Sequence, residues 1–181
     1  MKVFFDTEFT GLHQKTSLIS IGCVTEDDRT FYAEVEDYDR KQINDWISKN
    51  VIPGLIMADK EHNYRELDER GRNIKVRGTS AYVAEMLKEW LSPFDPVEIW
   101  SDCLAYDWVL FCELFGGAFD IPKNIYYIPF DLSTLLHLKG MDPDVNREEF
   151  AGMSPDSRIY KHNALYDAQV IKACYDKLMT A

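Results

Sequence analysis

The sequence predicts an α/β fold in which helices flank a mixed central sheet of about five strands. Three strand-like segments follow one another within the first 36 residues, and helical patterns then alternate with short apolar strands. Proline and glycine are few, at seven and nine of 181 residues, and 46% of the residues are hydrophobic. A chain of this length buries most of its apolar surface in one core, so we expect residues 1–181 to form a single domain.

Three predicted strands open the chain, at residues 2–6, 17–24 and 30–36. In the second, alternate side chains point to opposite faces, with Ile19, Ile21 and Cys23 on one of them. Polar turns separate the strands, the first of them at Thr10-Gly11. The three strands can therefore pair as an antiparallel meander.

Five segments then show apolar residues at helical spacing, at 43–51, 83–91, 108–115, 132–136 and 164–178. Pro53 and Pro93 end the first two, and Asp131 is placed to cap the fourth. Two short apolar runs between the helices predict the remaining strands, at 97–100 and 126–128. The polar stretch from Lys139 to Lys161 is predicted to be a loop.

Composition limits the class of protein. Thirty-one acidic residues against twenty basic ones give a net charge of −11, which disfavours a protein that coats nucleic acid without specificity. An enzyme acting on nucleic acid remains compatible, because divalent cations held by carboxylates make the site itself positive. The four cysteines form no C-x-x-C pair, and no apolar run approaches the ~18 residues of a membrane span. We therefore expect reduced thiols, no membrane contact and a cytoplasmic location.

Two carboxylates lie at the end of the first strand. Side chains two residues apart on a strand share a face, so Asp6 and Glu8 point into the same small volume. Like charges this close favour protonation unless a cation relieves them, and Mg²⁺ and Mn²⁺ take oxygen ligands. The pair predicts a metal site, and the alternative is a solvated polar turn at a strand end.

A second cluster, Lys161-His162-Asn163-Ala164-Leu165-Tyr166-Asp167, begins the last helix. In a helix the spacing of His162 and Asp167 corresponds to a rotation of about 140°, so the two do not form an i, i+4 metal-binding pair. Asp167 can instead bind a metal together with Asp6, while His162 approaches a water molecule as a general base. The alternative for each is a solvated residue near a helix start.

A third acidic segment, Ser101-Asp102-Cys103-Leu104-Ala105-Tyr106-Asp107, follows the strand at 97–100 and contains two candidate aspartates. Asp107 is preferred because it lies inside the helix, from which its carboxylate can face the strand ends. Asp102 is placed to cap that helix. The sequence leaves open which of the two joins Asp6 and Glu8.

Three segments resemble, in order, the motifs of the DEDDh 3′→5′ exonucleases. They are Phe5-Asp6-Thr7-Glu8-Phe9-Thr10-Gly11-Leu12, Ala105-Tyr106-Asp107 and His162-Asn163-Ala164-Leu165-Tyr166-Asp167. The first is close to the D-T-E-T-T-G-L form of the family, and the third fits its H-x-A-x-x-D. The second departs from the pattern, because many members have Asn where this chain has Cys103. Length and the second motif are most similar to a small bacterial and phage group of exoribonucleases.

The resemblance implies a ribonuclease H-like fold and a metal-dependent 3′→5′ exonuclease that releases nucleoside 5′-monophosphates. It implies that two Mg²⁺ or Mn²⁺ ions are held by Asp6, Glu8, Asp107 and Asp167, and that His162 is the general base. The substrate-binding residues that it implies are Thr7, Phe9, Thr10, Gly11 and Leu12. The implied substrate is single-stranded RNA or short oligonucleotides, and the oligomeric state, a homodimer included, stays open.

Two other functions remain as alternatives. One is a DNA-directed 3′→5′ exonuclease of the same chemistry, and the other is a nucleic-acid-binding module with a vestigial site. A basic cluster bears on substrate binding and consists of Arg70, Arg72, Lys75 and Arg77. These cations can hold phosphates upstream of the scissile bond, or they can balance the acidic residues around them.

Overall fold

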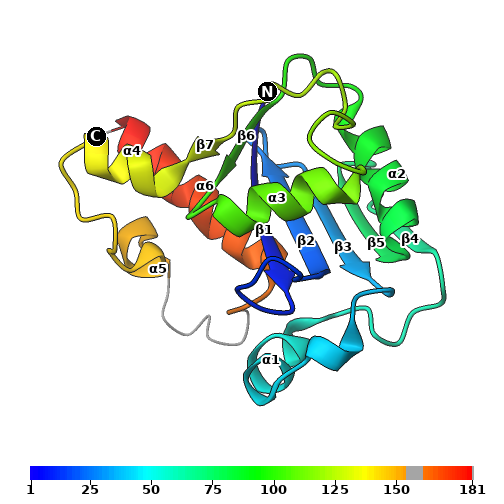
Figure 1. Cartoon of the computed structure of the whole chain (residues 1–181). Helices are drawn as coiled ribbons and strands as arrows, with labels where there is room; N and C mark the ends of the chain where they lie inside the picture. The colour runs from blue at the N-terminus through cyan, green and yellow to red at the C-terminus, as the bar shows by residue number, and fades with distance from the viewer. Residues whose placement is uncertain (154–160, 181) are drawn as a thin grey trace.

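The computed structural model describes residues 1–153 and 161–180. A seven-stranded mixed sheet in the order β4-β5-β3-β2-β1-β6-β7 runs through the molecule, with helices on both faces (Figure 1). The strands are β1 (Lys2–Phe9), β2 (Leu18–Thr25), β3 (Thr30–Val35), β4 (Tyr64–Leu67), β5 (Asn73–Gly78), β6 (Glu98–Ser101) and β7 (Phe130–Asp131). The α-helices are α1 (Asp45–Asn50), α2 (Ser80–Leu91), α3 (Ala105–Leu114), α4 (Leu132–Leu138), α5 (Arg147–Ala151) and α6 (Ala164–Thr180). Two 3-10 turns, η1 (Arg40–Gln42) and η2 (Ile52–Gly54), flank α1.

The predicted antiparallel meander is confirmed, since β2 pairs antiparallel with both β1 and β3. In this register Asp6 on β1 lies opposite Gly22 on β2. The predicted strand at 97–100 is also confirmed as β6, which pairs in parallel with β1. The α/β class and the mixed sheet are therefore as the sequence predicts, and the difference lies in the edges.

Two strands form where the sequence predicted none. β4 and β5 pair as an antiparallel hairpin, and β5 adds in parallel to β3. The side chains of β4 are mostly exposed, so this edge strand lacks the buried face that produces an alternating pattern. The expectation of about five strands is thus too low, and the sheet gains its extra width on this side.

The predicted strand at 126–128 is wrong. Tyr126, Tyr127 and Ile128 are exposed, and the strand on this side of the sheet is the two-residue β7, paired with β6. The prediction assumed that this apolar run is buried in the sheet, whereas its side chains lie at the surface. Just before this run, an isolated parallel bridge joins Ile125 to Val97.

The predicted loop from Lys139 to Lys161 contains the helix α5. Asn146 caps it, since its side chain accepts a hydrogen bond from the Glu149 amide at 2.9 Å. Gly152 ends it in the left-handed conformation, at φ 73°. Residues 154–160 of the same stretch lie outside the described residues.

The basic cluster lies on and just before β5, where acidic neighbours pair with three of its members. Arg77 forms an ion pair with Glu36 at 2.8 Å, and Lys75 pairs with Glu66 at 3.9 Å. Arg72 donates a hydrogen bond to the backbone of Asp27. This arrangement favours charge balance over phosphate binding for the cluster.

Two apolar layers cover the sheet. On one face α2 and α3 pack over a core that includes Val3 and Phe5 of β1. On the other face α4 and α6 pack over a core that includes Phe4. Because side chains alternate along a strand, Asp6 and Glu8 continue the Phe4 face and lie towards α6. Within the described residues, the helices lack the length and apolar composition needed to cross a membrane.

Candidate active site

Three carboxylates meet at the end of β1. One oxygen each from Asp6, Glu8 and Asp167 lies within 4.8 Å of the other two. Asp167 is in the first turn of α6, which comes close to the sheet because Gly22 has no side chain. A Cβ on Gly22 would lie 2.2 Å from the backbone nitrogen of Leu165. A glycine opposite Asp6 is therefore what allows the helix to bring its aspartate to the strand.

Asp107 reaches the same strand from α3. Its Oδ1 accepts hydrogen bonds from the Thr7 backbone N–H at 3.0 Å and from the Thr7 hydroxyl at 2.5 Å. Thr7 is buried and stands between Asp6 and Glu8 in the chain. Burial raises the pKa of Asp6, and the charge of Asp107 is the next largest cause of this rise. The strand thus ties the α3 carboxylate to the other three.

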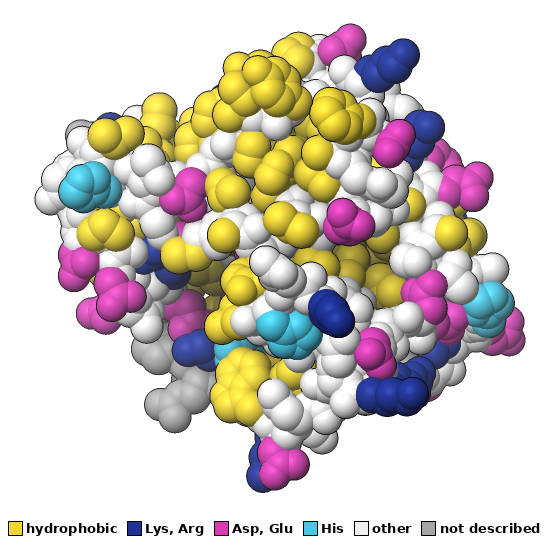
Figure 2. All heavy atoms as spheres, viewed as in Figure 1, with side chains coloured by type: hydrophobic (Ala, Val, Ile, Leu, Met, Phe, Trp, Pro, Cys, Tyr) yellow, Lys and Arg dark blue, Asp and Glu magenta, His cyan; other side chains and the backbone are white. Residues whose placement is uncertain are grey.

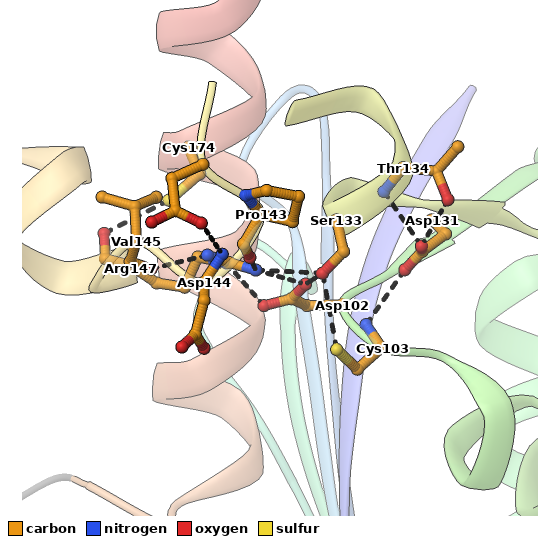
Figure 3. A network of polar contacts seen from close by, with 11 residues as sticks. Asp102, Cys103, Asp131, Ser133, Thr134, Pro143, Asp144, Val145, Arg147 and Cys174 are labelled. Carbon is orange, nitrogen blue, oxygen red and sulfur yellow. Dashed lines mark hydrogen bonds and ion pairs between the residues drawn. The ribbon is translucent and has the colours of Figure 1, made fainter. Parts of the chain in front are cut away.

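Asp102 is engaged elsewhere (Figure 3). Its two oxygens accept hydrogen bonds from Arg147, at 2.7 Å from Nε and 3.0 Å from Nη2, and the Ser133 hydroxyl donates at 2.6 Å. The prediction that Asp102 caps the following helix is wrong, because the N-cap position of α3 is Leu104. The geometry therefore favours Asp107 over Asp102 as the second-motif carboxylate.

The crowding of these acids changes their protonation. Burial, followed by the charges of Asp167 and Asp107, raises the pKa of Glu8 to about 8. Burial likewise raises the pKa of Asp107 to about 6 and that of Asp167 to about 7. Within the described residues, the only basic side chain within 4.0 Å of these carboxylates is His162, which lies beside Glu8. An oxygen-rich cluster with so little counter-charge fits divalent cations.

His162 precedes α6 and faces this cluster. Its Nδ1 lies 4.0 Å from Oε1 of Glu8. The edge of its ring packs against Trp46 of α1, with 5.0 Å between ring centroids. Burial, followed by the charge of Lys161, lowers the pKa of His162, so the imidazole is neutral at pH 7 and able to accept a proton.

Sequence reasoning missed one acidic residue beside the site, Glu148 of α5. The Tyr166 hydroxyl donates a hydrogen bond to its Oε1 at 3.2 Å, and the charge of Glu148 contributes, after burial, to the raised pKa of Asp167. The ion pair between Asp102 and the neighbouring Arg147 docks α5 here. No sequence pattern marked Glu148, because it lies in a stretch predicted to be a loop.

The connection between β1 and β2 begins with the predicted substrate-binding turn, and its later residues line a cavity together with α3. Phe9 stacks on Tyr106 of α3, with ring centroids 5.7 Å apart, while the Leu12 side chain is 76% exposed. Thr10 is buried and donates a hydrogen bond to Gln42 at 2.5 Å, and the Gly11 amide donates to Thr16 at 3.0 Å. The cavity encloses about 730 Å³, and its lining includes His13, Thr16, Leu18, Ser80, Tyr106 and Val109. Figure 2 shows apolar side chains gathered over α3 on this face of the molecule.

Comparison with known proteins shows the family of the chain. A model of the Rv2179c-like 3′-5′ exoribonuclease domain matches residues 1–179. The chain belongs to this family. Curated relatives of the Rv2179c-like family include the 3′-5′ exoribonucleases Rv2179c and MT2234.1 from two strains of Mycobacterium tuberculosis. Each is 27% identical over 146 residues, which cover 77% of this chain and 76% of the relative.

A solved structure has a similar fold. The RNase domain of the yeast Pop2 protein matches with a TM-score of 0.60 and 15% identity, covering 99% of this chain and 78% of that one. This likeness confirms the ribonuclease H-like fold that the motifs predict. The resemblance of those motifs to the 3′→5′ exonucleases is confirmed by the match to the Rv2179c-like family.

Proposed function

We propose that this chain is a metal-dependent exoribonuclease that removes nucleoside 5′-monophosphates from the 3′ end of single-stranded RNA or short oligonucleotides. The observation that carries the proposal is the convergence of the Asp6, Glu8 and Asp167 carboxylates, in a chain of the Rv2179c-like 3′-5′ exoribonuclease family. RNA is the proposed substrate because both curated relatives are named exoribonucleases.

Four carboxylates would hold two Mg²⁺ or Mn²⁺ ions: Asp6, Glu8, Asp107 and Asp167. When bound, the ions lower the pKa of an attacking water and stabilise the charge that develops on the leaving 3′ oxygen. Thr7 orients Asp107 by binding only Oδ1. Among the described residues no hydrogen bond engages Oδ2 of Asp107, and this second oxygen supports its assignment as a ligand.

His162 would take the proton of the attacking water. Three features support this role: its position 4.0 Å from Glu8, its lowered pKa, and its location on the rim between the carboxylates and Trp46. A base that is neutral at pH 7 accepts the proton without first having to lose one. Its removal should slow the reaction about 10²- to 10⁴-fold, the usual contribution of a positioned base.

The terminal nucleotide would lie beside the turn after β1. Leu12 is exposed there and available to pack on a base, and Phe9 stacks on Tyr106, which lines the cavity. Thr10 and Gly11 hold the turn in shape by hydrogen bonds within the protein. Thr7 contributes through Asp107, because its hydroxyl is engaged with that carboxylate.

The proposal is tested with a 5′-labelled single-stranded RNA and the matching DNA, each incubated with Mg²⁺, with Mn²⁺ and with EDTA. The wild-type chain is compared with Asp6→Asn and with Asp28→Asn. Asp28 is a matched control, because it is a surface aspartate at the β2–β3 turn, paired with Lys172 at 3.1 Å. We expect the RNA to shorten from its 3′ end in either metal, with the activity lost in EDTA and in Asp6→Asn but kept in Asp28→Asn.

Other outcomes distinguish the alternatives. Faster shortening of the DNA would favour the DNA-directed exonuclease. Binding of either strand without shortening, in folded wild-type protein supplied with Mn²⁺, would show that the site is vestigial. Shortening that persists in Asp6→Asn would mean that the carboxylate cluster is not the active site.

A further inference from the structure

The segment that follows α1 is fixed to the sheet by a buried carboxylate. Glu34 of β3 is 3% exposed, and its Oε1 accepts hydrogen bonds from the backbone N–H groups of Ile56 at 2.6 Å and Met57 at 2.9 Å. The Tyr32 hydroxyl donates to the same oxygen at 3.0 Å. A buried acid with three donors holds its partners firmly, so residues 52–57 have a set position beneath the start of α6.

This segment in turn holds the two residues that begin the third motif. The Asn163 side chain donates from Nδ2 to the carbonyl oxygen of Gly54 at 3.0 Å. Gly54 also packs against the carbonyl oxygen of His162, to which an added Cβ would come within 2.7 Å. Asn163 is 9% exposed, and its Oδ1 accepts from the Tyr166 amide at 3.2 Å. Asn163 therefore joins η2 to the first turn of α6.

The backbone held in this way is strained. His162 has φ 63°, in the left-handed region that residues other than glycine seldom occupy. Such a conformation persists where surrounding contacts impose it, and it often marks a functional residue. In this conformation the His162 ring packs against Trp46 and lies 4.0 Å from Glu8. In Figure 1, α1 lies at the same end of the sheet as the start of α6.

We propose that Asn163 and Gly54 are positioning residues for the general base. The Asn163–Gly54 hydrogen bond, anchored through residues 52–57 to Glu34, holds the His162 backbone in its left-handed conformation and so keeps the imidazole facing the carboxylates. This inference rests on the proposed function, because it gives Asn163 and Gly54 a role only if His162 is the base. The pair acts on the rate of the chemical step and not on substrate binding.

The first test is Asn163→Ser. Serine caps a helix about as well as asparagine, but its shorter side chain does not reach Gly54. We expect kcat on labelled RNA to fall about tenfold, with KM and the thermal midpoint close to the wild-type values. Asn146→Ser is the matched control, since Asn146 caps α5 by the same type of hydrogen bond and is expected to leave kcat unchanged.

A double-mutant cycle with His162→Ala then asks whether the effect passes through the base. We expect Asn163→Ser to slow the wild-type enzyme but to have no further effect in the His162→Ala background. Gly54→Ala, which crowds the His162 carbonyl directly, should behave in the same way. A purely structural role would instead reduce the rate equally in both backgrounds.

The possible outcomes distinguish the positioning role of Asn163 and Gly54 from the assignment of His162 as the general base. If His162→Ala is impaired but neither Asn163→Ser nor Gly54→Ala lowers kcat, the positioning role is wrong and the base assignment stands. If both variants lose their fold or slow both backgrounds equally, the contact is structural only. If His162→Ala is as active as the wild type, the base assignment is wrong and the positioning role falls with it.

Discussion

Replacing Gly22 with alanine tests how closely α6 must approach the sheet. Gly22 lies opposite Asp6, and an added Cβ would come within 2.2 Å of the Leu165 nitrogen and 2.3 Å of the Ala164 carbonyl carbon. These are backbone atoms, which cannot rotate away. To restore ordinary contact at ~3.5 Å, the start of α6 must move away from β2 by about 1 Å.

That displacement has two expected consequences. Overpacking of this kind should lower the free energy of unfolding by about 1–3 kcal/mol, measured by urea unfolding. A shift of about 1 Å in Asp167 relative to Asp6 should slow the reaction about 100-fold, measured as the shortening of labelled RNA at saturating Mn²⁺. Calorimetric titration with Mn²⁺ should also show weaker binding, since the carboxylates no longer converge.

Gly71→Ala serves as the control for lost stability alone. Gly71 also has a backbone conformation unfavourable for alanine, at φ 63°, but nothing lies within 4 Å of an added Cβ. It sits in the β4–β5 hairpin, away from the carboxylates, so this variant should be less stable and fully active. The reasoning is refuted if Gly22→Ala binds Mn²⁺ and cleaves RNA as well as Gly71→Ala does.

Three further predictions concern charge and protonation. Asp107→Asn should abolish cleavage and weaken Mn²⁺ binding. Asp102→Asn should keep the Mn²⁺ affinity of the wild type but lose about 2 kcal/mol of stability, because its contact with Arg147 is weakened. Equal Mn²⁺ affinities of the two variants would contradict the assignment of Asp107 as a metal ligand. In EDTA, the free energy of unfolding should fall as pH rises from about 4.5 to about 8, because folded Glu8, with its pKa raised to about 8, keeps a proton that the unfolded chain releases near 4.5. A flat urea-unfolding profile over this range would count against the buried cluster. At saturating Mn²⁺ the cleavage rate should decline only below about pH 6.5, since the pKa of His162 is lowered from 6.5, and this decline should be absent from the His162→Ala profile.

Much of the site could be predicted from short-range pattern. Asp6 and Glu8 share a face because a strand has a period of two, and that holds wherever the strand is placed. Gly22 could not be assigned its role in this way, since the backbone that it accommodates is more than 140 residues away in the chain. Glu148 was missed for the same reason, because only the fold brings α5 beside α6.

The incorrect predictions concern segments in which the sequence pattern does not show which side chains are buried. The hairpin of β4 and β5 is rich in charged residues: the side chains of β4 are mostly exposed, and β5 places its buried Ile74 and Val76 between polar residues. The run Tyr126-Tyr127-Ile128 has the composition of a strand, yet its side chains remain at the surface. The choice between Asp102 and Asp107 needed the position of Arg147, which is 45 residues from Asp102 in the chain.

Side chains along β1 point alternately to the two faces of the sheet, so the site depends on the number of residues in this strand as well as on their identity. Asp6 and Glu8 face α6, while Thr7 between them faces Asp107 of α3. Inserting or deleting one residue within the paired part of β1 would exchange these faces. The two acids would then enter the apolar layer under α3, and the threonine would replace them beneath α6. Changes of chain length are therefore compatible with activity only outside this strand, in connections such as the exposed β4–β5 turn.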